Sequence, residues 1–244
     1  MKRVRKLQAV FLAMALLLAA PPVAPAQTKV KPGMNLFSLR DDVAIGRRGA
    51  YEIERKYRTR YDPRVERIGR RLASRSAMPN LPWRFRVIDR REVNAFALPG
   101  GFVYVTSGLM NSVRSEDELA AVMAHEIMHV TLRHGTNQAS KAALAQMPLR
   151  LLGGLMGRGV GSTLAQLGIG LGLNSVLMKY SRDAETQADL GGIQMMRRAG
   201  YDPRGMARFL GRLKGGGAEF FSSHPNPSNR VERVEREINM LSRR

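Results

Sequence analysis

The order of apolar and polar residues along this chain divides it into helical segments and one region of short strands. Segments 41–57, 115–133, 181–198 and 228–242 read as helices, and in the second of them the apolar residues recur at a spacing of three and four. Region 83–106 differs, because it consists of short runs of aromatic and β-branched residues. The pattern predicts an α+β fold that is mainly helical.

The strand-rich region is predicted to form a small sheet. Its runs lie at 85–88, 95–97 and 102–105. Residues 99–101 read Pro-Gly-Gly, which favours a turn between the last two runs. We therefore expect these two runs to form a β-hairpin.

The predicted helix 115–133 carries the clearest candidate for chemistry. Ser115 and Glu118 form a capping-box pattern at its start. His125 and His129 are four residues apart and share one face, where two imidazoles can bind one zinc ion at about 2.0–2.1 Å. Glu126 lies on an adjacent side of the helix, from which a carboxylate can reach a zinc-bound water as a general base.

A third metal ligand is expected from the predicted helix 181–198. The chain contains no cysteine, so a metal must be held by His, Asp or Glu, and a catalytic zinc usually takes three protein ligands. Glu185 can bind the metal while Asp189, four residues on, accepts a hydrogen bond from the distal N–H of a ligand histidine. His134 is five residues beyond His129 and rotated away from the shared face, so we interpret it as a surface or capping residue.

Residues 1–26 have the layout of a secretory signal peptide. A basic start at 2–6 precedes an apolar stretch at 7–20, which is shorter than the roughly 20 residues of a membrane span. Ala24-Pro25-Ala26 is a small-x-small cleavage pattern, and no cysteine follows it for a lipoprotein anchor. We expect cleavage after Ala26, a single domain over 27–244 and a periplasmic location; an uncleaved N-terminal anchor is the alternative.

The balance of charge suggests one class of partner. The formal net charge is +20, which favours attraction to anionic surfaces. For an exported protein, anionic lipid or lipopolysaccharide is a more natural counterpart than nucleic acid, and a plain solvated basic surface is the alternative. Segment 142–178 has only two charges and many glycines. It is expected to form apolar helices that cover the site, touch a membrane or simply pack as a hairpin.

Several short motifs occur together in one order along the chain. They are residues 94–101, Gly108-Leu109-Met110, the helix with His125 and His129, residues 181–189, and His224-Pro225. In this order they resemble the gluzincin metallopeptidase family of HtpX and the CAAX prenyl proteases, most closely its exported bacterial branch with BepA and LoiP. The resemblance implies a zincin-like fold with a small sheet beside the HExxH helix and one zinc ion per chain. We expect no helical-repeat domain of the kind that BepA carries.

The resemblance also implies roles for individual residues. Glu185 is implied as the third zinc ligand and Glu126 as the base. His224 is implied as a gate over the metal or a catalytic partner of the oxyanion, and Arg230 as a helper in the same cleft. The segment from 94 to 104 is expected to lie along the substrate, which makes these residues candidates for substrate binding: Asn94, Ala95, Phe96, Ala97 and Tyr104.

These observations predict a zinc-dependent endopeptidase that hydrolyses peptide bonds in misfolded or unassembled cell-envelope proteins. A zinc-bound water would attack the peptide carbonyl with Glu126 as the general base. Its partners would be unfolded polypeptides, and no nucleic acid is expected. One alternative is a latent zincin-fold chaperone or envelope-binding protein, in which His224 or the apolar segment blocks the metal. Another is a basic protein that binds anionic surfaces.

Overall fold

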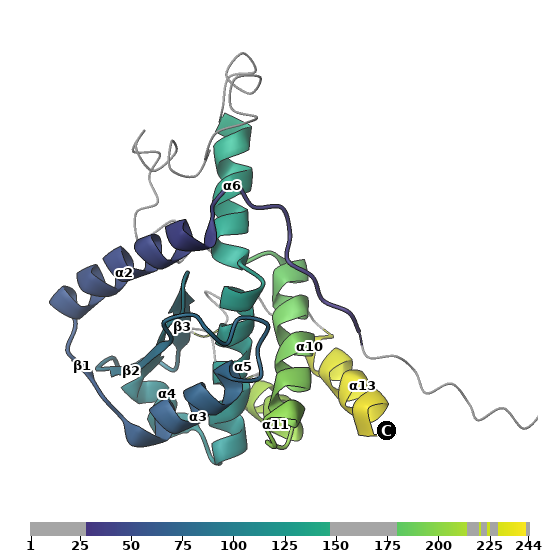
Figure 1. Ribbon diagram of the computed structural model, residues 1–244. Coiled ribbons are helices and arrows are strands. Elements are labelled where there is room, and N and C mark those ends of the chain that lie inside the picture. Colours follow the sequence, from purple (N-terminus) through teal and green to yellow (C-terminus); the bar gives the residue numbers. More distant parts are fainter. Residues whose placement is uncertain (1–27, 147–179, 214–219, 221–223, 225–228, 243–244) are drawn as a thin grey trace, which may run out of the picture.

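A computed structural model describes residues 28–146, 180–213, 220, 224 and 229–242, so the predicted signal peptide and most of the apolar segment lie outside the described residues. The described residues form helices and one small sheet that lies between α2 and α5, which confirms the predicted mainly helical α+β class (Figure 1). In chain order the elements are α2 (Leu39–Lys56), β1 (Thr59–Arg60), α3 (Pro63–Ala73), β2 (Arg84–Ile88), β3 (Ala95–Leu98), β4 (Phe102–Thr106), α4 (Ser107–Ser112), α5 (Glu116–Thr131), α6 (His134–Gln146), α10 (Arg182–Arg198), α11 (Arg204–Leu213) and α13 (Arg230–Ser242).

The sheet has the strand order β1-β2-β4-β3. Strands β3 and β4 form the predicted antiparallel hairpin, while β2 and β4 run parallel. At the hairpin turn Gly100 and Gly101 have φ angles of 78° and 106°, a region that side chains disfavour, and a Cβ on Gly100 would lie 2.5 Å from the Cα of Val43 in α2. Within the described residues β3 pairs on one side only, so it is an edge strand of the sheet.

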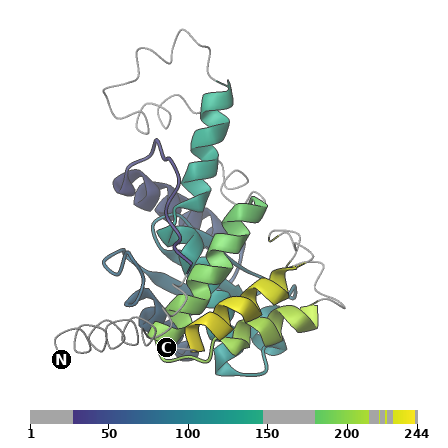
Figure 2. The same cartoon turned by 90° about the vertical axis from the view of Figure 1, so that its right-hand side faces the viewer.

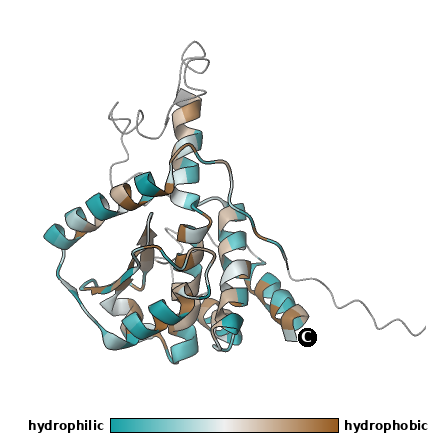
Figure 3. Ribbon diagram, viewed as in Figure 1, coloured by the Kyte–Doolittle hydropathy of each residue, from teal (hydrophilic) through white to brown (hydrophobic). Residues whose placement is uncertain are grey.

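Helix α5 lies at the centre of the molecule. Every residue from Glu118 to Thr131 is buried, because α3, α10, α11 and strand β3 all pack against this helix. Figure 3 shows the contrast with α2 and α13, which mix polar and apolar residues along their length. A helix covered on all sides can place polar side chains where water is excluded.

The start of α5 differs from its predicted capping box. Ser115 accepts a hydrogen bond from the backbone N–H of Glu118 at 3.2 Å, as expected. The carboxylate of Glu118 instead accepts from the backbone N–H of Arg114 at 2.7 Å and forms an ion pair with Arg212 of α11. Only half of the capping box is therefore present, because the buried carboxylate has a tertiary partner.

The junction between α5 and α6 is held by a partly buried ion pair. Arg133 has a φ of 55°. This backbone conformation interrupts the helix after α5 and turns the chain before α6 begins at His134. Its guanidinium donates to both oxygens of Asp42 in α2, at 2.6 and 3.0 Å, and to the carbonyl of Phe37 at 2.5 Å. These contacts stabilise a backbone conformation that non-glycine residues rarely adopt.

The N-terminal part of the described chain, residues 28–38, crosses several helices (Figure 1). The hydroxyl of Thr28 donates to the buried carboxylate of Glu237 in α13 at 2.8 Å, and its carbonyl accepts from Gln194 of α10 at 2.8 Å. Further on, Asn35 donates to Thr136 of α6 at 2.7 Å.

Figure 2 shows α10, α11 and α13 packed together on one side. Among the described helices, none is long and apolar enough to cross a bilayer.

Candidate metal centre

Two helices bring the predicted ligands together in the interior. His125 and His129 lie on the same face of α5, and Glu185 lies on α10. The Nε2 atoms of the two histidines are 2.9 Å apart, and oxygens of Glu185 lie 3.5 Å from His125 and 3.4 Å from His129. Together with His224 they offer four ligand atoms that all lie within 4.8 Å of one another.

Two glycines of α10 lie where this helix packs against α5. A Cβ on Gly191 would lie 2.2 Å from the Cε atom of Met128, so a side chain there would have to displace this methionine. A Cβ on Gly192 would lie 3.4 Å from the backbone nitrogen of His125. Glycine at these positions leaves room for Met128 and for the backbone of α5 at the contact between the two helices.

His125 is oriented by the contact predicted for Asp189. The Oδ1 atom of Asp189 lies 2.9 Å from Nδ1 of His125, which leaves Nε2 directed toward the cluster. Arg230 holds the same carboxylate by two hydrogen bonds, at 2.6 and 2.8 Å, and its Nη1 lies 3.3 Å from Glu185. Burial alone would raise the pKa of Asp189, but the charge of Arg230 and the contact with His125 outweigh it and lower the pKa.

The charges of this cluster fit a divalent cation. The carboxylates of Glu126, Glu185 and Asp189 are buried together with one guanidinium, that of Arg230, which leaves a formal charge of −2 with neutral imidazoles. Within the described part of the chain, neither oxygen of Glu126 nor Oε2 of Glu185 has a hydrogen-bond partner. Unsatisfied buried acceptors cost about 1–3 kcal/mol each, so a cation with its water would remove a large penalty. Two histidines and a glutamate form a known donor set for catalytic zinc.

The side chain of Glu126 lies beside the ligand cluster without being part of it. It is fully buried, and burial raises the pKa of its carboxyl group above the ordinary value. Its Oε1 atom lies 3.3 Å from Nε2 of His224. A carboxylate in this position can exchange a proton with a group held in the cluster.

His224 lies inside the cluster. Its Nδ1 atom is 3.2 Å from Nε2 of His125 and 3.1 Å from Oε1 of Glu185, and the residue is only 1% exposed. Its ring stacks on Phe220 with centroids 4.9 Å apart. The predicted ligand set did not include this histidine, yet the geometry gives it the place of a fourth ligand as well as that of a neighbour of Glu126.

The interpretation of His134 as a surface or capping residue is wrong. It is 7% exposed, and its Nδ1 atom lies 2.9 Å from Nδ1 of His129. The helical rotation on which the interpretation depended does not apply, because Arg133 breaks the helix between the two histidines. Tyr180, which the sequence analysis missed, stacks on His129 with ring centroids 3.8 Å apart and planes within 13°. Its position immediately before the capping residue Ser181 was the available signal.

The residues predicted to contact substrate are distributed over two faces of the hairpin. Ala95 and Ala97 belong to the core cluster beside α5, whereas Phe96 packs on the opposite face of the sheet. Asn94 is half-buried just before β3, where its side chain accepts from the backbone N–H of Ala95 at 2.9 Å.

Tyr104 does not fit the predicted role of a direct substrate contact. It is 1% exposed, and its hydroxyl donates to Glu54 of α2 at 2.9 Å. Strand β4 lies between β2 and β3, so its backbone is also fully engaged. The reason is the alternation of side chains along a strand, which turns Tyr104 toward α2 and away from the metal cluster.

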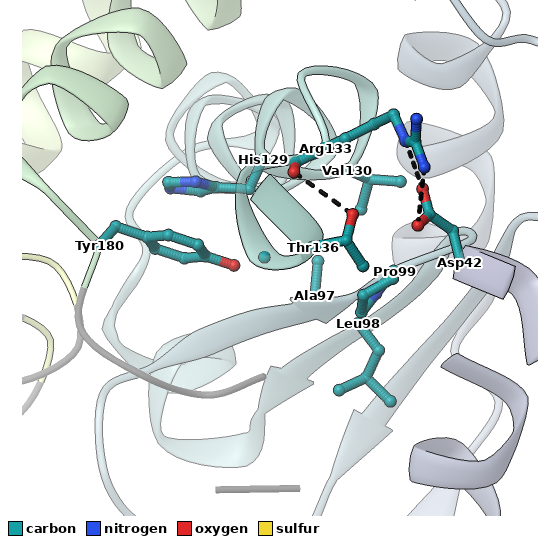
Figure 4. A pocket seen from close by; sticks show the side chains of 10 residues that line it. Asp42, Ala97, Leu98, Pro99, His129, Val130, Arg133, Thr136 and Tyr180 are labelled. Atoms are coloured by element: carbon teal, nitrogen blue, oxygen red, sulfur yellow. Dashed lines mark hydrogen bonds and ion pairs between the residues drawn. The ribbon is translucent and has the colours of Figure 1, made fainter. Parts of the chain in front are cut away.

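A small pocket lies between the metal ligands and the hairpin (Figure 4). His129 and Tyr180 form one side, and the ion pair between Asp42 and Arg133 lies at the other. The remaining wall includes Ala97 and neighbouring residues of β3. The small recess therefore lies between residues of β3 and the metal ligand His129.

Comparison with known proteins places this arrangement among metallopeptidases. The model of Peptidase family M48 matches residues 59–238. The Beta-barrel assembly-enhancing protease of Escherichia coli (strain K12) is 32% identical over 189 residues, which cover 72% of this chain and 39% of that protein. The homologous protease of Yersinia pestis is 29% identical over 260 residues, covering 93% and 52%. The Mitochondrial metalloendopeptidase OMA1 of Schizosaccharomyces pombe is 31% identical over 177 residues, covering 70% and 51%. The chain thus spans about half or less of the length of these relatives.

Proposed function

Because the chain belongs to peptidase family M48, as the order of its motifs indicated, we propose that it is a zinc-dependent endopeptidase. The observation that carries the proposal is the buried carboxylate of Glu126, which has no hydrogen-bond partner among the described residues and lies beside the cluster of His125, His129 and Glu185. A general base needs this combination of proximity and an unoccupied lone pair.

His125, His129 and Glu185 would hold the metal. Bound zinc would polarise the carbonyl of the cleaved peptide bond and lower the pKa of a water molecule toward ~7. Glu126 would accept a proton from the attacking water molecule as the water oxygen bonds to the carbonyl carbon. The same carboxyl then gives the proton to the nitrogen as the carbon–nitrogen bond breaks. Asp189 keeps His125 in the tautomer that offers Nε2 to the metal.

The substrate would bind as an extended chain along the outer edge of β3. Main-chain hydrogen bonds to an edge strand recognise backbone rather than side chains, so this mode accepts many sequences. Asn94 to Ala97 would border the substrate through their backbone, next to the small recess beside Tyr180. A site that needs an extended backbone selects unfolded polypeptides.

We place the activity in the cell envelope. The signal-peptide pattern of residues 1–26 supports export to the periplasm, with 27–244 as one domain. The names of the bacterial relatives refer to β-barrel assembly, which supports misfolded or unassembled envelope proteins as substrates. Cleavage after Ala26 would remove four basic residues and no acidic one, and the remaining excess of basic residues supports association with anionic lipid or lipopolysaccharide at the membrane surface.

Replacement of Glu126 by glutamine tests the proposal directly. The side chain keeps its shape but loses the basic oxygen, so we expect casein cleavage to fall about 10²–10⁴-fold while zinc stays bound. Glu235→Gln, at an exposed position of α13, is the matched control and should cleave normally. Unchanged cleavage in Glu126→Gln would contradict the assigned base.

The position of His224 favours a second candidate, a latent zincin-fold chaperone or binding protein. This imidazole lies within 3.3 Å of both Glu126 and Glu185, where it competes with water and substrate for the same space. In a latent protein, wild type would bind unfolded chains without cleaving them, and His224→Ala would gain cleavage. In a constitutive enzyme, wild type cleaves and His224→Ala is no faster.

A further inference from the structure

His134 and Gln187 connect the second metal ligand to the helix that carries the third. The Nδ1 atoms of His129 and His134 lie 2.9 Å apart, and the two rings meet edge to face with centroids at 5.0 Å. On its other side, Nε2 of His134 lies 3.4 Å from Oε1 of Gln187. Gln187 is on α10, two residues after Glu185.

The direction of the His129 ring determines the proton positions in the hydrogen-bonded series His129–His134–Gln187. Its Nε2 atom faces the cluster, 2.9 Å from Nε2 of His125, so this nitrogen must offer a lone pair to a metal. Nδ1 of His129 then carries the hydrogen and donates it to His134. His134 accepts at Nδ1, carries its own hydrogen at Nε2 and directs it toward the amide oxygen of Gln187.

We propose that His134 and Gln187 are positioning residues that fix the tautomer and ring direction of His129 for metal binding. This inference rests on the proposed zinc site. His129, His134 and Gln187 come from α5, α6 and α10. Their hydrogen bonds therefore also set the distance between the helices that supply His129 and Glu185.

The two ligand histidines are supported differently. His125 donates to the charged carboxylate of Asp189, which Arg230 neutralises. His129 donates to a neutral imidazole and is covered on one face by the ring of Tyr180. Loss of the His134 imidazole would leave the Nδ1–H of His129 buried without an acceptor, since His129 is 2% exposed.

The experiment measures the dissociation constant of zinc by competition with a chromophoric chelator, using purified protein. We expect His134→Leu to bind zinc about 10–100-fold more weakly, because outer partners of ligand histidines contribute that much to affinity. His134→Asn keeps an acceptor and should recover most of the loss. Lys141→Leu introduces the same side chain at an exposed position of α6 and should bind like wild type.

The outcomes separate this inference from the proposed function. Equal zinc affinity in wild type and His134→Leu would overturn the positioning role alone, while failure of the wild type to bind zinc would overturn the metal site itself. A purely structural role for His134 would lower the melting temperature of the metal-free protein without changing zinc affinity, and would also overturn the inference. If His134→Leu does not fold, Gln187→Leu gives the same test. Weaker zinc binding in this variant supports the positioning role, and unchanged zinc affinity contradicts it.

Discussion

The ion pair between Asp189 and Arg230 is predicted to couple the stability of the fold to the metal site. Both side chains are nearly fully buried, and two hydrogen bonds at 2.6 and 2.8 Å join them. Removing one partner of such a pair leaves an uncompensated buried charge, which costs about 3–5 kcal/mol. Arg230 keeps a contact with Glu185 at 3.3 Å, so we expect Asp189→Asn to cost about 3 kcal/mol, at the lower end of this range.

The double variant gives the coupling. Arg230→Met leaves the carboxylate of Asp189 with only the imidazole of His125, and should cost a similar amount. In the double variant each substitution removes the charge that the other would leave buried without its partner. The two losses in unfolding free energy should therefore not add. We expect a coupling energy of about 2–3 kcal/mol in the cycle, within the range seen for residues in one network.

Urea denaturation of the metal-free protein, with a chelator present, measures all four free energies of unfolding. Zinc titration of the same proteins supplies a second readout. Asp189→Asn should weaken zinc binding about 10–100-fold, because His125 loses the group that orients it. Additive stability costs, together with unchanged zinc affinity in Asp189→Asn, would refute the reasoning.

Two further predictions concern residues away from the metal. Tyr104→Phe should lower the free energy of unfolding by about 1 kcal/mol, because the hydroxyl loses its bond to Glu54, and should leave KM for peptides unchanged; a raised KM with intact stability would restore Tyr104 to the substrate path. Glu118 has a lowered pKa, because burial, which would raise it, is outweighed by Arg212 and the N–H of Arg114. Its stabilising contribution is therefore present above the unfolded pKa of about 4.3 and is lost as pH falls through the lower folded value. The difference in unfolding free energy between wild type and Glu118→Gln should shrink with acidification below that pH, and a constant difference would contradict the assignment.

The parts of the site that follow from local spacing could be predicted from the sequence. His125 and His129 share a helix face, and so do Glu185 and Asp189, since residues four apart on a helix are neighbours. The hairpin turn at Gly100 was equally local. Each of these depends only on residues close in the chain.

Other features depend on contacts between distant segments. The parallel pairing of β2 with β4 and the two-residue strand β1 have no local signal. His134 was misplaced because the rotation of a continuous helix was assumed, whereas the ion pair of Arg133 with Asp42 fixes a break there. Tyr104 was misplaced because Phe96 and Tyr104 point to the face opposite Ala95 and Ala97, and which face meets the site is decided by the packing of α2 and α5.

The most direct test of the account is the zinc content of the purified protein, measured by elemental analysis beside the Glu185→Ala variant. The account predicts one zinc ion per wild-type chain. Glu185→Ala should lose it, because the two imidazoles alone leave the cation without its charged ligand. Wild-type protein without stoichiometric zinc, or a variant that keeps its full affinity, would contradict the metal centre on which the proposed peptidase depends.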